Sequence, residues 1–231
     1  MNDRPIHEAA QRGDVAALRR ELEDGVSANA LGSNHRTPLH YLYLRNDNAE
    51  ARVECVHMLI EAGADVNAPT PPSVDQNTPL HFAADCGHAK LVAALIKAGA
   101  DVNRGNNDNI TPLHFACCRS DSDGPALLLL RNGAAVDART SLGLLRTPLD
   151  WAIHYSSYRL VPILLRAGAA LPAETDDAYI QKVIAAGGFE TYKRIHLDAL
   201  AASFVPKFAH RSLPPEMVRR VVEYAFHVGY Y

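Results

Sequence analysis

Apolar positions recur at helical spacing along most of the chain, in pairs of short segments separated by glycine and polar turns. Residues 89–98, "AKLVAALIKA", carry an apolar stripe with a period near 3.6 residues. They are followed by "GA", where the glycine can adopt the left-handed conformation that ends a helix. A shorter apolar segment precedes them and ends near Gly87, and another ends near Gly13. The pattern therefore predicts pairs of helices.

The helical pairs follow an internal repeat. "TPLH" occurs at Thr37, Thr78 and Thr111, "TPLD" at Thr147, and a weaker "RPIH" at Arg4. The starts are 33, 41, 33 and 36 residues apart. Short insertions after Thr37, before Thr78, after Thr111 and before Thr147 account for the two longer spacings. One 33-residue template therefore explains the whole series, which is the sequence signature of a repeat architecture.

Local chemistry explains how each unit begins and why units must stack. Threonine is a favoured N-cap, and proline at the first helical position loses no hydrogen bond there. The first helix carries small side chains at the alanine pairs Ala9–Ala10 and Ala83–Ala84, so neighbouring units can approach closely. Neither helix of a pair can bury its apolar face alone. We therefore expect the core to come from stacking.

The repeat resembles the ankyrin repeat, through "TPLHFAA", "GH" and "GADVN" in the unit at Thr78. This resemblance implies an all-α ankyrin-repeat solenoid of stacked helix-turn-helix units with hairpin fingers, plus C-terminal helices. We expect five repeats in residues 1–170, with units that start near residues 4, 37, 78, 111 and 147. Residues 171–204 are expected to form a degenerate sixth repeat or capping helices, because Ala185–Ala186 fall where the template predicts an alanine pair.

Composition and charge narrow the kinds of partner. The chain has 231 residues, a formal net charge of −3 and 21% charged residues, so it has no overall attraction to nucleic acid or acidic lipid. Its N-terminus lacks an apolar signal region, and no apolar run approaches eighteen residues. We expect a cytoplasmic or nuclear monomer that binds neither nucleic acid nor membranes. The four cysteines lie in apolar patterns without C-x-x-C spacing and are expected to be reduced.

One histidine per unit recurs at His40, His81 and His114, which looks like a catalytic or metal-binding set. Each follows an N-cap threonine by three residues, so we expect its side chain to hydrogen-bond the turn of its own or the adjacent repeat. The sequence contains no H-E-x-x-H motif, phosphate-binding glycine loop or nucleophile elbow. We therefore expect no enzymatic activity, no metal site and no cofactor.

The resemblance assigns partner binding to a concave face formed by the hairpin tips and the exposed side of each first helix. The mixture of arginine, aspartate, aromatic and amide side chains there suits a protein epitope or an extended peptide better than a phosphate backbone. The alternative is that these residues are ordinary solvated surface. The predicted contact residues are Arg12, Arg36, Leu44, Arg45, Asp85, Asn107, Asp108, Arg119, Arg146, His154 and Tyr155.

Two inserted loops add to this face. Residues 68–77, "APTPPSVDQN", are rich in proline and are predicted to form an extended finger. Residues 141–146, "SLGLLR", place Leu142, Leu144 and Leu145 in a turn that would normally be polar. These leucines either remain exposed and invite a partner or fold back onto the next repeat.

Two segments, "LIEAGADVN" and "LIKAGADVN", also resemble sites of the asparaginyl hydroxylase that modifies ankyrin proteins. That enzyme favours leucine eight residues before the target asparagine and aspartate two residues before it. Asn67 and Asn103 satisfy both conditions and are the candidate hydroxylation sites. The same residues belong to the ankyrin consensus, so folding explains them equally well.

The chain ends with "RSLPPEMVRRVVEYAFHVGYY", which does not follow the repeat. In residues 205–231, Ser212 can cap a helix that carries Met217, Val218 and Val221 on one face. The simplest interpretation is a lid that covers the apolar end of the solenoid.

This ending also resembles the start of an F-box, which docks on the Skp1 adaptor of cullin ubiquitin ligases, in a truncated form like that of the PRANC family. The ending also resembles a SOCS box, since Leu197, Ala201 and Val205 have the spacing of the elongin-binding helix. This second resemblance is less close, because Ala201 stands where the SOCS box has a cysteine and the intervening stretch is short. In the SOCS resemblance the later Leu213–Pro214 step selects the cullin. The candidate ligase-docking residues of this ending are Leu213, Pro214, Met217, Val218 and Val221. The hypotheses are a ligase adaptor, a scaffold or inhibitory effector without a ligase, and a hydroxylase substrate.

Overall fold

The structure, a computed structural model, describes residues 5–43, 48–119, 122–143, 146–173 and 175–197. The chain divides into two compact units, Met1–Ala169 (unit 1) and Ala170–Tyr231 (unit 2). The regular elements in the described residues are helices, and no strand occurs among them. The predicted C-terminal helix in residues 205–231 lies outside the described residues.

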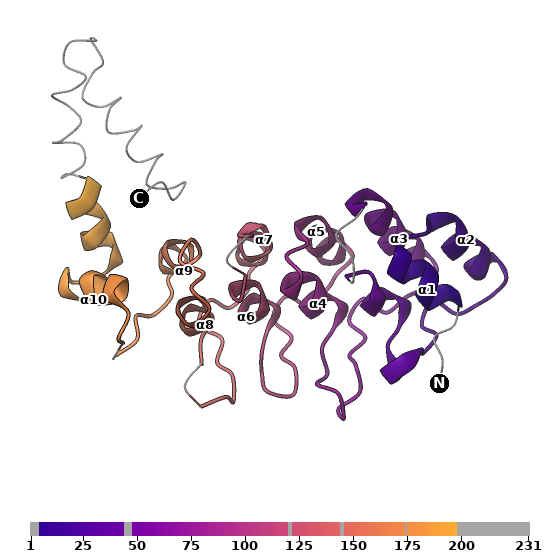
Figure 1. The fold of residues 1–231 in the computed structure, drawn as a ribbon, viewed down its shortest axis with the longest axis horizontal. Coiled ribbons are helices and arrows are strands. Elements are labelled where there is room, and N and C mark those ends of the chain that lie inside the picture. The colour runs from indigo at the N-terminus through magenta and orange to yellow at the C-terminus, as the bar shows by residue number, and fades with distance from the viewer. Residues whose placement is uncertain (1–4, 44–47, 120–121, 144–145, 174, 198–231) are drawn as a thin grey trace, which may run out of the picture. The chain divides into compact units, whose positions relative to one another are not determined.

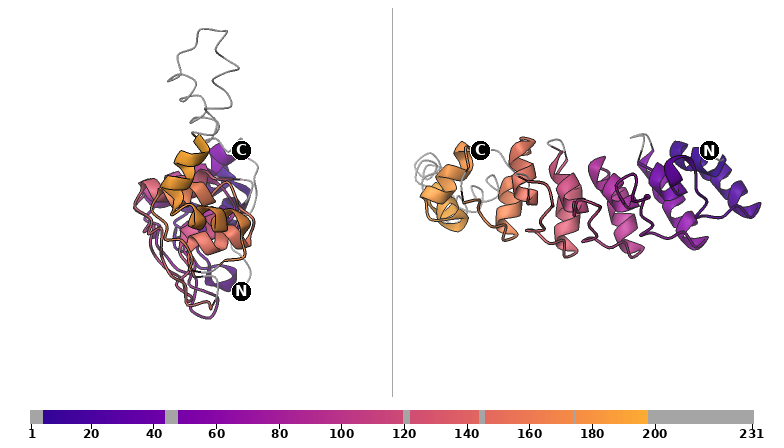
Figure 2. Two further views of the ribbon diagram at one scale, coloured as in Figure 1. Left: turned by 90° about the vertical axis from the view of Figure 1, so that its left-hand side faces the viewer. Right: turned by 90° about the horizontal axis from the view of Figure 1, so that it is seen from below.

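Unit 1 is a row of helical pairs in two layers (Figures 1 and 2). The first helices are α1 (Pro5–Arg12), η2 (Pro38–Tyr41), α4 (Pro79–Asp85), α6 (Pro112–Cys117) and α8 (Pro148–His154). The second helices are α2 (Val15–Glu23), α3 (Ala49–Glu61), α5 (Ala89–Lys97), α7 (Gly124–Arg131) and α9 (Val161–Arg166). Helices of the same layer pack on those of neighbouring repeats, as α4 does on α6 and α5 on α7. The all-α solenoid predicted from the repeat is confirmed.

The unit at Thr78 shows how the sequence produces one pair. Thr78 has extended backbone angles and Pro79 begins α4, as the capping signal predicts. The turn to α5 passes through Gly87, whose φ of +74° is in the left-handed region that favours glycine. Leu80 and Val92 are fully buried, and burial of one such side chain contributes about 1.5–3 kcal/mol. Stacking therefore supplies the core.

The unit at Thr37 departs from the template. Its first helix, η2, is a 3₁₀-helix, preceded by a second 3₁₀ turn, η1 (Ser33–His35). The second helix, α3, begins only at Ala49, after the insertion that follows Thr37. Arg52 of α3 is 1% exposed and donates to the carbonyl oxygens of Leu42, after η2, and Gln11, in α1. A buried guanidinium thus satisfies carbonyls at the ends of two neighbouring first helices.

The loops between repeats form fingers on the side of the first helices (Figure 1). The proline-rich finger, residues 68–77, is closed by a hydrogen bond from the Thr70 N–H to the Asn77 carbonyl at 2.9 Å. The next finger is tied to it, because the Asn107 N–H donates to the Asp75 carbonyl at 2.9 Å. A third finger follows in the same way, with the Ser141 N–H 2.8 Å from the Asp108 carbonyl oxygen. The fingers therefore support one another.

Unit 2 contains helix α10 (Ala178–Ala185), which Asp177 caps by accepting a hydrogen bond from the Ile180 N–H at 2.9 Å. Residues 189–197 are also helical. Tyr179 and Tyr192 meet edge to face, with ring centroids 5.4 Å apart, and join the two segments. Two helical segments thus lie in the region where the sequence predicts a degenerate repeat or capping helices.

Candidate functional site

The repeated histidines hold neighbouring repeats together. The Nδ1 atom of His81 accepts a hydrogen bond from the Thr78 N–H at 3.0 Å, and its Nε2 lies 3.0 Å from the Ile110 carbonyl oxygen in the next finger. His40 and His114 make the same pair of contacts, reaching the carbonyls of Asn77 and Arg146 at 3.3 Å. Because one nitrogen faces a donor and the other an acceptor, the geometry selects the neutral Nε2–H tautomer. The predicted structural role is confirmed.

The environment of these rings agrees with that role. Burial lowers the pKa of His40, His81 and His114 to about 4, so all three are neutral at pH 7. Both ring nitrogens of each are already used by the backbone. Among the described residues, no group of three or more His, Cys, Asp or Glu side chains could hold a metal ion.

An aromatic side chain meets each histidine from the next repeat. His40 contacts Phe82 edge to face with ring centroids 5.8 Å apart, and His114 contacts Trp151 in the same way at 5.5 Å. The last of the five repeats has no histidine at this position, which Asp150 occupies instead. Its carboxylate accepts from the Thr147 N–H at 2.8 Å, which preserves the cap of its own helix.

We use the term concave face for the surface that the first helices and the fingers of unit 1 form together. Its most organised part is a cluster of Arg36, Tyr43 and Phe82. The Phe82 and Tyr43 rings stack with centroids 4.7 Å apart and planes 13° from parallel. The guanidinium carbon of Arg36 lies 5.0 Å from the Phe82 ring centroid, and its Nη1 donates to the Tyr43 hydroxyl at 3.1 Å. Burial raises the pKa of Tyr43, which keeps that hydroxyl neutral.

Asp85 ends α4, and Arg119 follows the C-terminus of α6 in the next repeat. Both side chains are half-buried. Burial raises the pKa of Asp85, and the positive charge of Arg119 opposes this shift. The structure therefore brings these two predicted contact residues within electrostatic range of each other.

The other predicted contact residues are more dispersed. Arg12 is exposed and pairs with Glu8, one turn earlier on α1, at 3.2 Å. Arg146 is exposed and donates from Nε to the Gly143 carbonyl at 2.8 Å. His154 and Tyr155 are exposed at the end of α8, with ring centroids 4.9 Å apart. Leu44 and Arg45 lie outside the described residues.

The two predicted finger residues are exposed, but one of them also has a structural role. The Asn107 side chain donates from Nδ2 to the Pro72 carbonyl at 2.6 Å, in addition to its backbone bond to the neighbouring finger. Asp108 is exposed and contributes its carbonyl to the tie with the third finger. In that finger Leu142 is 38% exposed, whereas Leu144 and Leu145 lie outside the described residues.

The candidate hydroxylation sites lie at junctions between repeats. Asn67 donates from Nδ2 to the Gly99 carbonyl at 3.2 Å and accepts at Oδ1 from the Asp101 N–H at 2.8 Å. Asn103 repeats the arrangement with Gly133 at 3.0 Å and Ala135 at 2.7 Å. Both amides therefore link neighbouring units, and hydroxylation stays a prediction.

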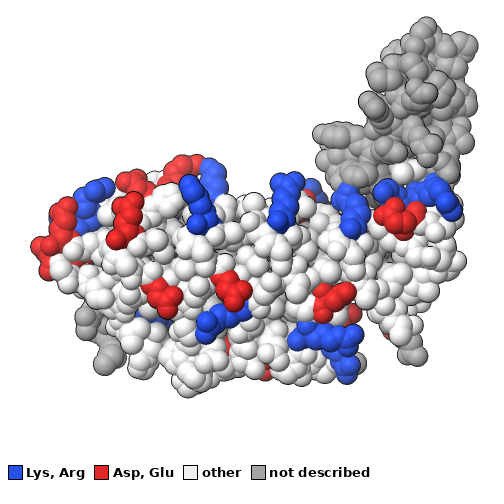
Figure 3. Space-filling view, turned by 180° about the vertical axis from the view of Figure 1, so that it is seen from behind, with Lys and Arg blue, Asp and Glu red and all other residues white. Residues whose placement is uncertain are grey.

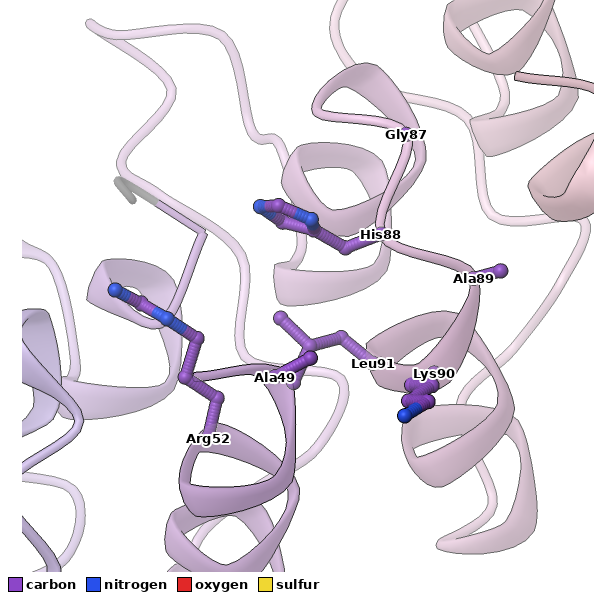
Figure 4. Close-up of a pocket in the computed structure, with 7 residues that line it drawn as sticks. All are labelled: Ala49, Arg52, Gly87, His88, Ala89, Lys90 and Leu91. Atoms are coloured by element: carbon purple, nitrogen blue, oxygen red, sulfur yellow. The ribbon is translucent and has the colours of Figure 1, made fainter. Parts of the chain in front are cut away.

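A cavity of about 220 Å³ lies between the N-terminal ends of α3 and α5 (Figure 4), and nothing in the sequence indicated it. Its polar lining side chains already have partners in the protein. Arg52 donates to backbone carbonyls, His88 lies 3.2 Å from the Tyr43 carbonyl oxygen, and Lys90 pairs with Glu50. We therefore assign this cavity no ligand.

Acidic and basic side chains are interspersed on the back of unit 1 rather than gathered into one basic surface (Figure 3). This description covers the described residues on the visible side. No helix among the described residues is long and apolar enough to span a membrane.

Comparison with known sequences identifies the repeat. A family model described as ankyrin repeats, in three copies, matches residues 48–140. These residues are ankyrin repeats. Together with the stacked pairs of unit 1, the match makes the fold an all-α ankyrin-repeat solenoid. Because ankyrin repeats mediate protein–protein contacts, the chain contains a protein–protein interaction module.

Several curated proteins are similar to this chain. Human ankyrin repeat and SOCS box protein 16 is 35% identical over 171 residues, which cover 71% of this chain and 36% of that protein. Human inversin is 32% identical over 165 residues, covering 70% of this chain and 14% of inversin. Human ankyrin repeat and SOCS box protein 3 is 35% identical over 105 residues, covering 46% of this chain and 19% of that protein. The chain thus spans about a third or less of the length of these relatives.

Proposed function

We propose that unit 1 binds a protein partner on its concave face. The observation that carries this proposal is the cluster of Arg36, Tyr43 and Phe82, where a half-buried cation and two stacked rings gather on the first-helix side. Arginine and aromatic side chains are the residues most enriched at the energetic centres of protein interfaces. We propose a cytoplasmic location and no catalytic role.

We further propose that residues 205–231 connect this module to a cullin-type ubiquitin ligase. Two observations support the idea. The segment contains the Leu213–Pro214 step, and two similar human proteins carry a SOCS box in their names. The names of these relatives favour an elongin-type adaptor over Skp1. The proposed ligase-docking residues are Leu213, Pro214, Met217, Val218 and Val221.

The test is a comparative pull-down of the intact chain and a Leu213→Ala, Pro214→Ala double variant from cell extract. We expect elongin or Skp1 to be recovered with the intact chain and lost with the variant, while circular dichroism shows both folded. A matched control is Pro72→Ala, which changes an exposed proline in a finger of unit 1.

The pull-down separates the two parts of the proposal. Recovery of neither adaptor by the intact chain would contradict the ligase connection and leave the binding module intact. A fall in the melting temperature of the double variant would then indicate that residues 205–231 form a lid on the apolar end of the solenoid. In that case a scaffold or inhibitory effector without a ligase becomes the better function.

A third candidate function is that of an asparaginyl hydroxylase substrate. Leu59, Asp65 and Asn67 have the required spacing, and the same is true in the next repeat. The test is coexpression with the enzyme and mass spectrometry of the peptides that contain Asn67 and Asn103. An added oxygen atom on either peptide supports the proposal, and unmodified peptides contradict it.

A further inference from the structure

Arg36 is held in place by its surroundings. Its backbone N–H donates to the Ser33 carbonyl at 3.3 Å, and its carbonyl accepts from the Gly32 N–H at 2.9 Å, so the finger fixes its main chain. The side chain is fixed at its other end by the bond to the Tyr43 hydroxyl and by the face of the Phe82 ring. A guanidinium held at both ends loses little conformational entropy when it binds a ligand.

The hydrogen-bonding capacity of Arg36 is not filled. Its Nε atom is buried and has no hydrogen-bond acceptor in the residues that the structure describes. Among the described residues, no carboxylate lies within ion-pair distance of its guanidinium. The paired arginines, such as Arg19 with Glu54, are instead exposed, with more than half of each side chain accessible. Within the described part of the chain, Arg36 is thus a half-buried cation without a counter-ion, which carries a desolvation cost that a carboxylate would offset.

The charges around Arg36 restrict the kind of anion. Asp85, one turn after Phe82 on α4, is close enough for its charge to raise the pKa of Tyr43. A negative group so near the cluster disfavours a doubly charged ligand such as a phosphate. A carboxylate carries one charge and matches the planar fork of a single guanidinium. The stacked Phe82 and Tyr43 rings beside it offer apolar surface for a neighbouring side chain.

We propose that Arg36 recognises one aspartate or glutamate carboxylate of a partner peptide, with an apolar side chain of the same peptide packed against Phe82 and Tyr43. This inference rests on the proposed function, because it assumes that the concave face binds a protein. It goes further by naming the chemistry of the partner and the residue that determines specificity. The partner segment is acidic, and its acid faces the second and third repeats.

The experiment is a selection of random displayed peptides of about twelve residues on the intact chain, followed by affinity measurements on synthetic peptides. We expect the enriched peptides to share an acidic position next to an apolar one. Arg36→Gln should weaken binding by about tenfold or more, the usual effect of removing a charge-assisted hydrogen bond. Arg36→Lys should bind with intermediate affinity, because it keeps the charge without the fork.

Two controls make the result specific. Arg131→Gln removes an exposed arginine from the outer layer and should leave the affinity unchanged. Replacing the shared acid of the peptide by its amide should cost about as much as Arg36→Gln, and the two changes together should cost little more than either alone. Thermal unfolding of each variant checks that the fold is retained.

Four outcomes count against the inference, and they are distinguishable. Enriched peptides without a shared acid, or equal affinity for the wild-type chain and Arg36→Gln, would overturn the inference and keep the binding module. If no peptide is enriched on the wild-type chain, both the inference and the proposed peptide-binding role of the concave face are contradicted. An additive effect of the two changes would show that the acid binds elsewhere, which also overturns the inference.

Discussion

The Nε2 atom of His81 lies 3.0 Å from the carbonyl oxygen of Ile110, twenty-nine residues further along the chain. The other nitrogen of the same ring accepts the Thr78 N–H. One side chain therefore closes the start of its own helix and fastens the next finger. The bond from the Thr78 N–H exists only while the ring is neutral, because a protonated ring has no acceptor for the amide.

Acid should therefore destabilise the protein well above the range in which most carboxylates titrate. The pKa of His40, His81 and His114 is lowered from 6.5 to about 4, so between these values the unfolded chain binds protons that the folded chain does not. Their stabilisation is complete above pH 6.5 and falls as the pH decreases towards 4, by about 1.4 kcal/mol per pH unit for each ring. Urea unfolding at pH 7 and pH 5 measures the difference.

The raised pKa of Asp85 acts in the opposite direction, because its folded form binds a proton more readily than the unfolded chain. One partly buried carboxyl should not cancel three buried imidazoles. Equal stability at pH 7 and pH 5 would contradict the neutral-ring arrangement.

His81→Ala should lower the free energy of unfolding by about 2 kcal/mol or more. The substitution leaves the buried Thr78 N–H without its acceptor, and an unsatisfied group of this kind costs about 1–3 kcal/mol. It also removes the bond that ties the ring to the Ile110 carbonyl, which keeps the Asn106 N–H as its donor. His57→Ala, at an exposed position on α3, is the matched control and should change stability little. Chemical denaturation measures the free energy of unfolding of both variants. An equal loss in the two variants would show that the His81 ring does not stabilise the junction.

Arg52→Met should destabilise unit 1 by about 2–4 kcal/mol. Methionine can fill the space of the aliphatic stem, but the carbonyls of Leu42 and Gln11 lose a buried charged donor. Arg131→Met removes an exposed arginine and provides the comparison. If calorimetry finds the same melting temperature for both variants, Arg52 does not fasten the first two repeats.

Asn67→Asp should cost about 1 kcal/mol, because the carboxylate can still accept from the Asp101 N–H but can no longer donate to the Gly99 carbonyl. Asn109→Asp makes the same chemical change at an exposed finger position. Denaturation midpoints of the two variants should therefore differ. A destabilisation confined to Asn109→Asp would mean that the amide link between repeats contributes nothing.

The partly exposed cysteines should react slowly in the folded protein. Burial raises the pKa of Cys86 to about 11 and that of Cys118 to about 12, so very little thiolate is present at pH 8. Alkylation followed by mass spectrometry should show rates at least about a hundredfold lower than in urea, where thiols titrate near pH 8.5. Fast labelling of either residue in the native protein would contradict this.

The sequence predicted the parts of the fold that depend on local pattern. Threonine, proline and glycine at fixed offsets located the helices, and the position of His81 after a capping threonine predicted a backbone partner. The insertion after Thr37 was also visible in the spacing. The structural consequence of the insertion is a 3₁₀ first helix supported by the buried Arg52, and the sequence did not predict it. No local rule connects an arginine on a helix with carbonyls ten and forty-one residues away.

The candidate site shows the same limit. Arg36 was predicted as a contact residue on its position alone. The contact of Arg36 with the Phe82 ring was not predicted, because Phe82 belongs to the next repeat and meets Arg36 only when the repeats stack. Asn107 was predicted to face a partner, and its bond to Pro72 depends on two fingers that meet only in the folded chain. Contacts between repeats are set by packing geometry, which a single unit does not contain.

The junction bonds join equivalent positions one repeat apart, so they do not depend on how many repeats there are. Removal of residues 78–110 would join Asn77 to Thr111, and the Asn77 carbonyl would remain available to His40. Phe115 would then take the place of Phe82, and Gly133 would receive the amide of Asn67 in place of Gly99. Loss of this unit would therefore preserve the hydrogen bonds of the junction that replaces it, and the number of stacked repeats could change without new contacts being needed between them.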